Sequence, residues 1–81
     1  MKPYTPVPSH VVERLEIAIL TGERLDLHWA DEHSQRAYAS RILPQEVLDI
    51  EGRQYLQAVN DEGQDVLLRL DLIRNLPTPV K

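Results

Sequence analysis

Hydrophobic and polar residues follow two different periods along this chain. Between Ser9 and Gly22, apolar residues recur at three- and four-residue spacing, which predicts an amphipathic helix over residues 9–22. These apolar residues are Val11, Val12, Leu15, Ala18 and Ile19. Ser9 is expected to cap the start of the helix, and Gly22 is expected to end it. The preceding residues 1–8 include three prolines and therefore predict an extended arm.

From Leu25 onward the period changes to two, which is typical of β-strands. The predicted strands cover residues 25–29, 35–43, 47–50, 53–60 and 66–72. Turns are expected at residues 31–34, at Glu51-Gly52 and at residues 60–63. Pro44 is expected to interrupt the second strand, because proline cannot donate to a strand ladder.

The last predicted strand has the clearest orientation. Val66, Leu68, Leu70 and Leu72 form one apolar face, so Arg69 and Asp71 are expected on the opposite face. There they would form a plain salt bridge that contributes under about 1 kcal/mol.

Together these elements predict a single domain over residues 1–81, mainly β with one N-terminal helix, of the α+β class. About five short antiparallel strands favour a strongly bent sheet or a partly open barrel over residues 25–73. The helix is expected to cover one open end or face of it. The prolines near the C-terminus predict a loose tail over residues 75–81.

The net charge of -4 falls on residues 25–81, because acids and bases balance in the first 24 residues. A nucleic-acid-binding protein normally carries a basic stripe, since phosphate contacts supply most of its affinity. Direct binding of nucleic acid is therefore not expected. The surplus of acid suits a solvated surface or a face for a basic protein partner.

The sequence offers little for catalysis or metal binding. His28, Asp31 and His33 have ligand-like spacing, but they lie across a strand end and a turn, so no metal is predicted. The serines stand in no nucleophile motif and the glycines in no phosphate-binding loop, so neither an enzyme nor a cofactor is expected. No apolar run is long enough to span a bilayer, and a cytoplasmic location is expected.

Three aromatic residues lie on predicted strands. Trp29, Tyr38 and Tyr55 could form a platform on which nucleic-acid bases stack. However, Trp29 is in register with Leu25 and Leu27, which favours a place in the core.

Several short motifs follow one another in a specific order from Tyr4 to Ile73. They are Tyr4-x-Pro6-Val7, Leu15-Glu16-Ile17-Ala18, Leu25-x-Leu27, Asp31, Tyr55-Leu56, Gly63 and Leu68-Arg69-Leu70-Asp71 with Ile73. In this order they resemble the Rof family of Rho-binding antiterminators. The resemblance implies an Sm-like or SH3-like β-barrel with an N-terminal helix, which binds the transcription terminator Rho and impedes its loading on RNA.

On this chain, the resemblance places the contacts with Rho on the helix. Glu13 and Glu16 are the expected acidic contacts, with His10 and Arg14 beside them. The chain departs from the family where Ser9 to Val12 stand in place of a cysteine, two acids and an aromatic residue.

The second half of the chain carries another set of motifs. They are Arg41-Ile42-Leu43-Pro44, Gln54-Tyr55-Leu56, Ala58 and the segment from Leu68 to Ile73. This set resembles the WYL domain, an Sm-like barrel of bacterial transcription regulators, with Gln54 in place of the signature tryptophan. The resemblance implies a module that senses a ligand, often nucleic acid, with Arg41, Tyr55 and Arg69 as binding residues.

A third alternative is a general protein-interaction domain. An exposed strand edge could pair with another copy of the chain, which would give a monomer or a weak dimer.

Overall fold

The computed structural model describes residues 3–75 and 78–79 of the chain, and it contains one helix followed by an antiparallel sheet. The elements are α1 (Ser9–Thr21), β1 (Leu25–Ala30), β2 (Ala37–Ile50), β3 (Arg53–Asn60), β4 (Asp65–Arg69), the 3₁₀ helix η1 (Leu70–Leu72) and β5 (Thr78–Pro79). The strand order is β4-β3-β2-β1-β5. This confirms the expected mainly β fold with one N-terminal helix.

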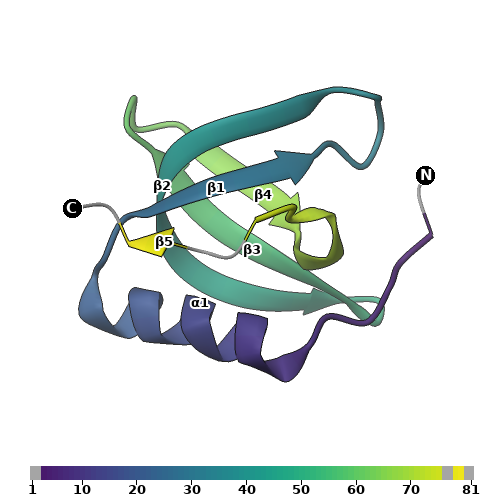
Figure 1. Ribbon diagram of the computed structural model, residues 1–81, viewed down its shortest axis with the longest axis horizontal. Helices are drawn as coiled ribbons and strands as arrows, with labels where there is room; N and C mark the ends of the chain where they lie inside the picture. Colours follow the sequence, from purple (N-terminus) through teal and green to yellow (C-terminus); the bar gives the residue numbers. More distant parts are fainter. Residues whose placement is uncertain (1–2, 76–77, 80–81) are drawn as a thin grey trace.

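The sheet curls strongly but does not close into a complete barrel (Figure 1). Its edges are β4 and β5, and after η1 the described residues 73–75 run along β1. In that segment Ile73 forms a bridge with Trp29, and the N–H of Arg74 donates to the carbonyl of His28 at 2.7 Å. The Asn75 side chain continues the contact, because its Oδ1 accepts from the N–H of His28 at 2.8 Å. The expectation of a bent, partly open sheet is therefore confirmed.

Helix α1 lies across one end of the curled sheet and packs on β2 (Figure 1). Leu15 and Ala18 are buried, as the apolar stripe predicts. Gly22 ends the helix with a left-handed φ of 72°, as expected. The start differs from the prediction, because Pro8 holds the cap position without a side-chain hydrogen bond and Ser9 is already helical. None of the described helices is long and apolar enough to cross a membrane.

The core lies inside the curl of the sheet and beneath α1. Alternate residues of β1 and β3 contribute to it, which confirms the period-two pattern in these strands, and β2 and β4 add further residues. Its buried members are Leu15, Ala18, Leu25, Leu27, Trp29, Ile42, Leu56, Ala58, Leu68 and Leu70. Trp29 therefore belongs to the core, as its register with the leucines indicates.

Strand β2 differs from the prediction, because Pro44 does not divide it into two strands. The pairing with β3 shifts between Pro44 and Glu46, where one extra residue forms a β-bulge. Pro44 is opposite Ala58, whose backbone groups bond to Val66 of β4, so the ladder to β3 does not need the missing N–H of proline. The adjacent bulge bends the strand. The long strand can therefore curve around the core without ending at Pro44.

The C-terminal part also differs from the prediction. The last long strand stops at Arg69, and Leu70–Leu72 turn into η1. Thr78 and Pro79 pair with Asp26 and Leu25, so this part of the expected loose tail is a short strand. The rest of that tail, residues 76–77 and 80–81, lies outside the described residues, as do residues 1–2 of the arm.

Both hairpins after β2 use the expected turns. Glu51 and Gly52 have φ values of 52° and 79°, and two positive φ angles are the geometry of a type I′ turn. In the next turn, Asn60 Oδ1 accepts hydrogen bonds from the N–H groups of Glu62 and Gln64 at 3.0 and 2.9 Å. This second turn fixes the register between β3 and β4.

Candidate functional site

An aromatic pair stands on the hairpin formed by β1 and β2. Trp29 and Tyr38 are directly opposite in the strand register, and their rings stack with centroids 5.7 Å apart and an interplanar angle of 25°. Trp29 is buried, whereas Tyr38 is 43% exposed. The pair therefore extends from the core to the surface, where part of the Tyr38 ring is exposed to solvent. Stacking of this kind contributes about 0.5 to 1.5 kcal/mol.

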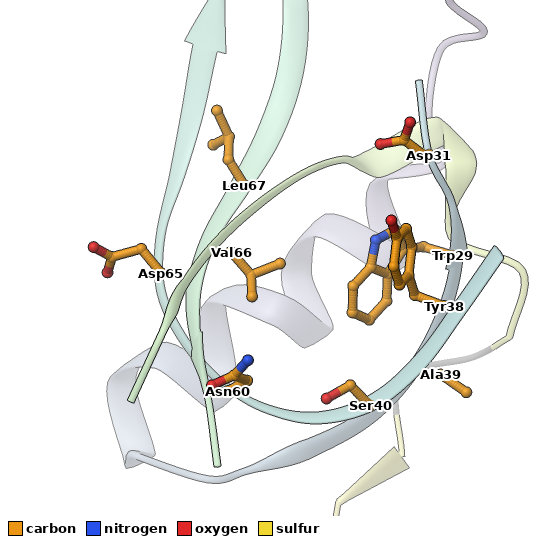
Figure 2. Close-up of a pocket in the computed structure, with 9 residues that line it drawn as sticks. All are labelled: Trp29, Asp31, Tyr38, Ala39, Ser40, Asn60, Asp65, Val66 and Leu67. Carbon is orange, nitrogen blue, oxygen red and sulfur yellow. The ribbon is translucent and has the colours of Figure 1, made fainter. Parts of the chain in front are cut away.

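The exposed side of this pair forms one wall of a cavity of about 410 Å³, called here the aromatic groove (Figure 2). Its hairpin wall is Trp29, Tyr38, Ala39 and Ser40, its β4 wall is Asp65, Val66 and Leu67, and Asp31 and Asn60 complete it. In Figure 2 the Val66 side chain points toward the two rings, whereas Asp65 and Leu67 point away from them.

Acidic residues border the aromatic groove, although the Asp65 side chain is directed away from the rings (Figure 2). Among the described residues that line it, the only charged side chains belong to Asp31 and Asp65. The hydroxyl of Ser40 and the amide of Asn60 add neutral polar groups. A groove of this kind suits a ligand that combines an apolar or aromatic part with neutral or positive groups, and it disfavours phosphate.

A second group of polar residues is buried on the opposite face of β3 and β4. The side chain of Arg69 is 0% exposed, and its Nε and Nη2 donate to the two oxygens of Asp71 at 2.7 and 2.8 Å. Nη2 also donates to the carbonyl of Pro3 at 2.8 Å. The Tyr4 ring lies over the guanidinium, with its centroid 5.7 Å from Cζ. The arginine therefore fastens the N-terminal arm to the sheet.

Tyr55 and Glu32 complete this group. The whole group, called here the arginine cluster, consists of Arg69, Asp71, Tyr55, Glu32 and the arm residues 3–5. The Tyr55 hydroxyl donates to Glu32 Oε2 at 2.9 Å, and Arg69 Nη1 lies 3.5 Å from the same oxygen. The N–H of Thr5 donates to Asp71 Oδ2 at 2.9 Å. The cluster thus joins the arm, the loop between β1 and β2, strand β3 and η1.

The environment of the arginine cluster shifts three pKa values. Burial and the hydrogen bond to Glu32 raise the pKa of Tyr55. The hydrogen bonds to Asp71 raise the pKa of Arg69. Burial alone would raise the pKa of Asp71, but the hydrogen bonds from Arg69 and from the N–H of Thr5 outweigh it and lower that pKa. Together these shifts favour a charged Arg69, a charged Asp71 and a neutral Tyr55 at neutral pH.

A family model of the WYL domain matches residues 10–77, which is most of the chain.

The chain belongs to the WYL domain family.

This match supports the resemblance seen in the second half and extends it to the helix. The resemblance to the Rof family stays an expectation.

Among solved structures, this WYL domain is similar to proteasome accessory factor B/C (PafBC) of Arthrobacter aurescens, with a TM-score of 0.77 at 16% sequence identity. The similarity covers 96% of this chain and 12% of that chain. At this identity the similarity shows a shared fold. No curated protein matches the sequence.

The three binding residues implied by the WYL resemblance do not come together in one site. Arg41 is half exposed, and its Nε lies 3.8 Å from Asp61, which also pairs with Arg24 at 3.1 Å. Tyr55 and Arg69 are buried in the arginine cluster. The prediction of a plain, solvent-exposed salt bridge between Arg69 and Asp71 was wrong. The pair faces away from the leucines, but the N-terminal arm covers it and both side chains are buried.

The helix residues expected to contact a protein partner divide between two hollows of the WYL domain. His10, Glu13 and Arg14 line a cavity of about 370 Å³ together with Ile17. Glu16 lines a separate hollow with Leu20 and residues of β2. Their role in partner binding stays a prediction.

The sequence alone did not reveal the β4 wall of the groove or the role of Glu32. Trp29, Tyr38 and Tyr55 do not form one stacking platform, because Tyr55 lies on the other face of the sheet, within the arginine cluster. The useful signal was the alternation along β4, which places Val66 on the same face as Leu68. Glu32 gave no signal, because its loop is brought to Arg69 only by the curl of the sheet.

Removing the guanidinium of Arg69 should strongly destabilise the domain. Arg69→Ala leaves the Asp71 carboxylate buried without its partner, which costs about 3 to 5 kcal/mol of the free energy of unfolding. Arg69→Lys should be intermediate, because an ammonium cannot bond both carboxylate oxygens in the same planar geometry. Urea unfolding followed by circular dichroism gives both values. Equal stabilities of Arg69→Ala and wild type would contradict the proposed role of the cluster.

The stability of the domain should fall at both ends of the pH scale. The pKa of Asp71 is lowered by folding, so its contribution is present above the unfolded value of about 3.9 and is lost as the pH falls through the folded value. The pKa of Tyr55 is raised, so its contribution is present below about 10 and is lost as the pH rises through the folded value. Urea unfolding across pH should show a plateau between these limits. Tyr55→Phe should flatten the alkaline decline, and an unchanged decline would disprove the assignment.

Proposed function

We propose that this WYL domain is a non-enzymatic sensing module of bacterial transcription regulation, and that it binds its ligand in the aromatic groove. The observation that carries the proposal is the pairing of a half-exposed Tyr38 with a buried Trp29 on the wall of a cavity of about 410 Å³. Large aromatic surfaces that are both exposed and held by the core are typical of binding sites.

The chemistry of the groove defines the ligand. Asp31 and Asp65 disfavour anions, and Tyr38 offers a ring face to an aromatic or cationic group. A nucleic-acid ligand, which the family resemblance implies, would require cations beside the rings. Arg41 and Arg69 lie elsewhere and already have acidic partners. We therefore infer a neutral or cationic ligand with an apolar part.

Ligand binding can be coupled to the rest of the domain through the loop between β1 and β2. Asp31 in this loop lines the aromatic groove, and its neighbour Glu32 belongs to the arginine cluster. A ligand that contacts Asp31 and β4 would thus act on the same two segments that the Glu32–Arg69 ion pair joins at 3.5 Å. Because Arg69 also donates to the carbonyl of Pro3, a shift of this ion pair would extend to the N-terminal arm.

Replacing Tyr38 should weaken ligand binding without unfolding the domain. A fragment library of neutral, cationic and anionic aromatic compounds can be screened by NMR, and the indole signal of the single Trp29 reports on the groove. Tyr38→Ala should weaken the binding of cationic hits about fivefold, because it removes one aromatic face worth about 1 kcal/mol.

Ile50→Ala is the matched control, because Ile50 is also 43% exposed but does not line the groove. Equal losses in both variants, or a preference for anionic hits, would count against the proposed site.

A second candidate function is binding of a basic protein, of which Rho is the one implied by the Rof resemblance. The observation that favours it is the outer face of α1, where Ile17 and Leu20 are exposed close to Glu13 and Glu16. Exposed apolar residues beside acids are typical of an interface for a partner with basic residues around an apolar patch.

The double change Glu13→Lys/Glu16→Lys tests this second function. If α1 contacts Rho through its acids, the variant should bind Rho at least about tenfold more weakly at low salt, because two attractive pairs become repulsive. Glu51→Lys/Glu62→Lys is the matched control, because it makes the same change of charge at two exposed residues in turns outside α1. If sedimentation shows no complex between Rho and the wild-type domain, this mechanism is wrong. It is also wrong if the double change leaves the affinity of the complex unchanged.

A further inference from the structure

Strand β4 has a free edge whose backbone groups can be assigned from the register. In the adjoining turn, the N–H of Asn60 donates to the carbonyl of Gln64 at 3.0 Å, so this pair is hydrogen bonded. In antiparallel strands, hydrogen-bonded pairs alternate with pairs that are not. Val66 and Leu68, opposite Ala58 and Leu56, therefore bond to β3. Asp65, Leu67 and Arg69 direct their N–H and C=O groups to the other side.

This outer side of β4 is open next to the aromatic groove. β4 is the terminal strand of the sheet, and no hydrogen bond among the described residues reaches the outer backbone groups of Asp65 or Leu67. Both residues line the groove, and Leu67 is 52% exposed. Unpaired groups at a strand edge are a template for another extended chain.

We propose that the β4 edge binds an extended basic segment of a partner protein, which adds a strand to the sheet within the aromatic groove. This inference rests on the proposed function, and it names the class of ligand. The backbone of the segment would bond to Asp65 and Leu67, while Trp29 and Tyr38 would contact the side chains that face the groove.

The side chains of β4 specify the sequence of such a segment. On the outer face, a residue opposite Leu67 would be apolar, and one opposite Asp65 would be lysine or arginine. On the groove face, a residue opposite Val66 would be apolar, because it meets the two aromatic rings. Asp31 adds a second acid beside the groove.

Charge argues against the other occupants of this edge. A nucleic acid would bring its phosphates to Asp31 and Asp65, with no cation among the described residues that line the groove. A second copy of the chain carries the same net charge of -4. The only cation on its β4 is Arg69, whose guanidinium is already buried against Asp71.

The test uses a labelled heptapeptide, Thr-Lys-Val-Val-Val-Lys-Thr, and a version with glutamate in place of both lysines. Fluorescence anisotropy should show binding of the lysine peptide at least about tenfold tighter than that of the glutamate peptide. In NMR titrations the amides of Asp65 and Leu67 and the indole of Trp29 should shift together. A preference for the glutamate peptide, or shifts confined to α1, would overturn the proposal.

Leu67→Pro separates strand addition from simple contact with the side chain. It removes an N–H that points away from β3, so an edge strand can tolerate it, but it should abolish peptide binding. Leu67→Ala keeps the N–H and should lose less than about tenfold. If Leu67→Pro does not fold, methylation of alternate peptide amides gives the same test, because one of the two alternating methylation patterns must block the bonds to β4.

The outcomes distinguish the inference from the proposed function. If peptide binding is indifferent to Leu67→Pro and to both methylation patterns, or if an oligonucleotide binds in place of the peptide, strand addition is wrong. If no peptide binds but small cationic aromatics still bind in a Tyr38-dependent way, this inference fails and the proposed function stands. If neither binds, both fail.

Discussion

The structure depends above all on the buried pairing of Arg69 with Asp71. An arginine side chain without solvent contact is costly unless its charge and its hydrogen bonds are matched. Here the matching groups come from several parts of the chain: the carboxylate of Asp71, the carbonyl of Pro3, the ring of Tyr4 and the carboxylate of Glu32. Because the guanidinium needs all of them, the arm and the loop between β1 and β2 are fixed against the sheet.

The aromatic groove and the arginine cluster occupy opposite faces of the same strand. Val66 and Leu68 share the inner face of β4, whereas Leu67 and Arg69 share its outer face, as the alternation along a strand requires. The loop between β1 and β2 reaches both sites, with Asp31 at the groove and Glu32 at the cluster. Strand β4 and this loop are therefore the two elements through which occupancy of the groove can reach the N-terminal arm.

The periodic segments could be predicted from the sequence, but the groupings between segments could not. The apolar stripe of α1, the alternation in β1 and the turns at Gly52 and Gly63 are local patterns, and all are found in the structure. The predicted break at Pro44 was wrong, because a bulge accommodates proline inside a long strand. Leu70–Leu72 continue the strand alternation in sequence but form η1, which carries Asp71 to Arg69.

By itself, the sequence determined the class of fold and its acidic character, since the period of the apolar residues and the balance of charges need no tertiary information. It also indicated that Trp29 belongs to the core. Only the tertiary structure decided that Arg69 is buried, that Tyr55 and Tyr38 lie on different faces, and that β4 offers a free edge beside an aromatic wall. These features depend on how far the sheet curls and where it stops, which is set by contacts between residues far apart in the chain.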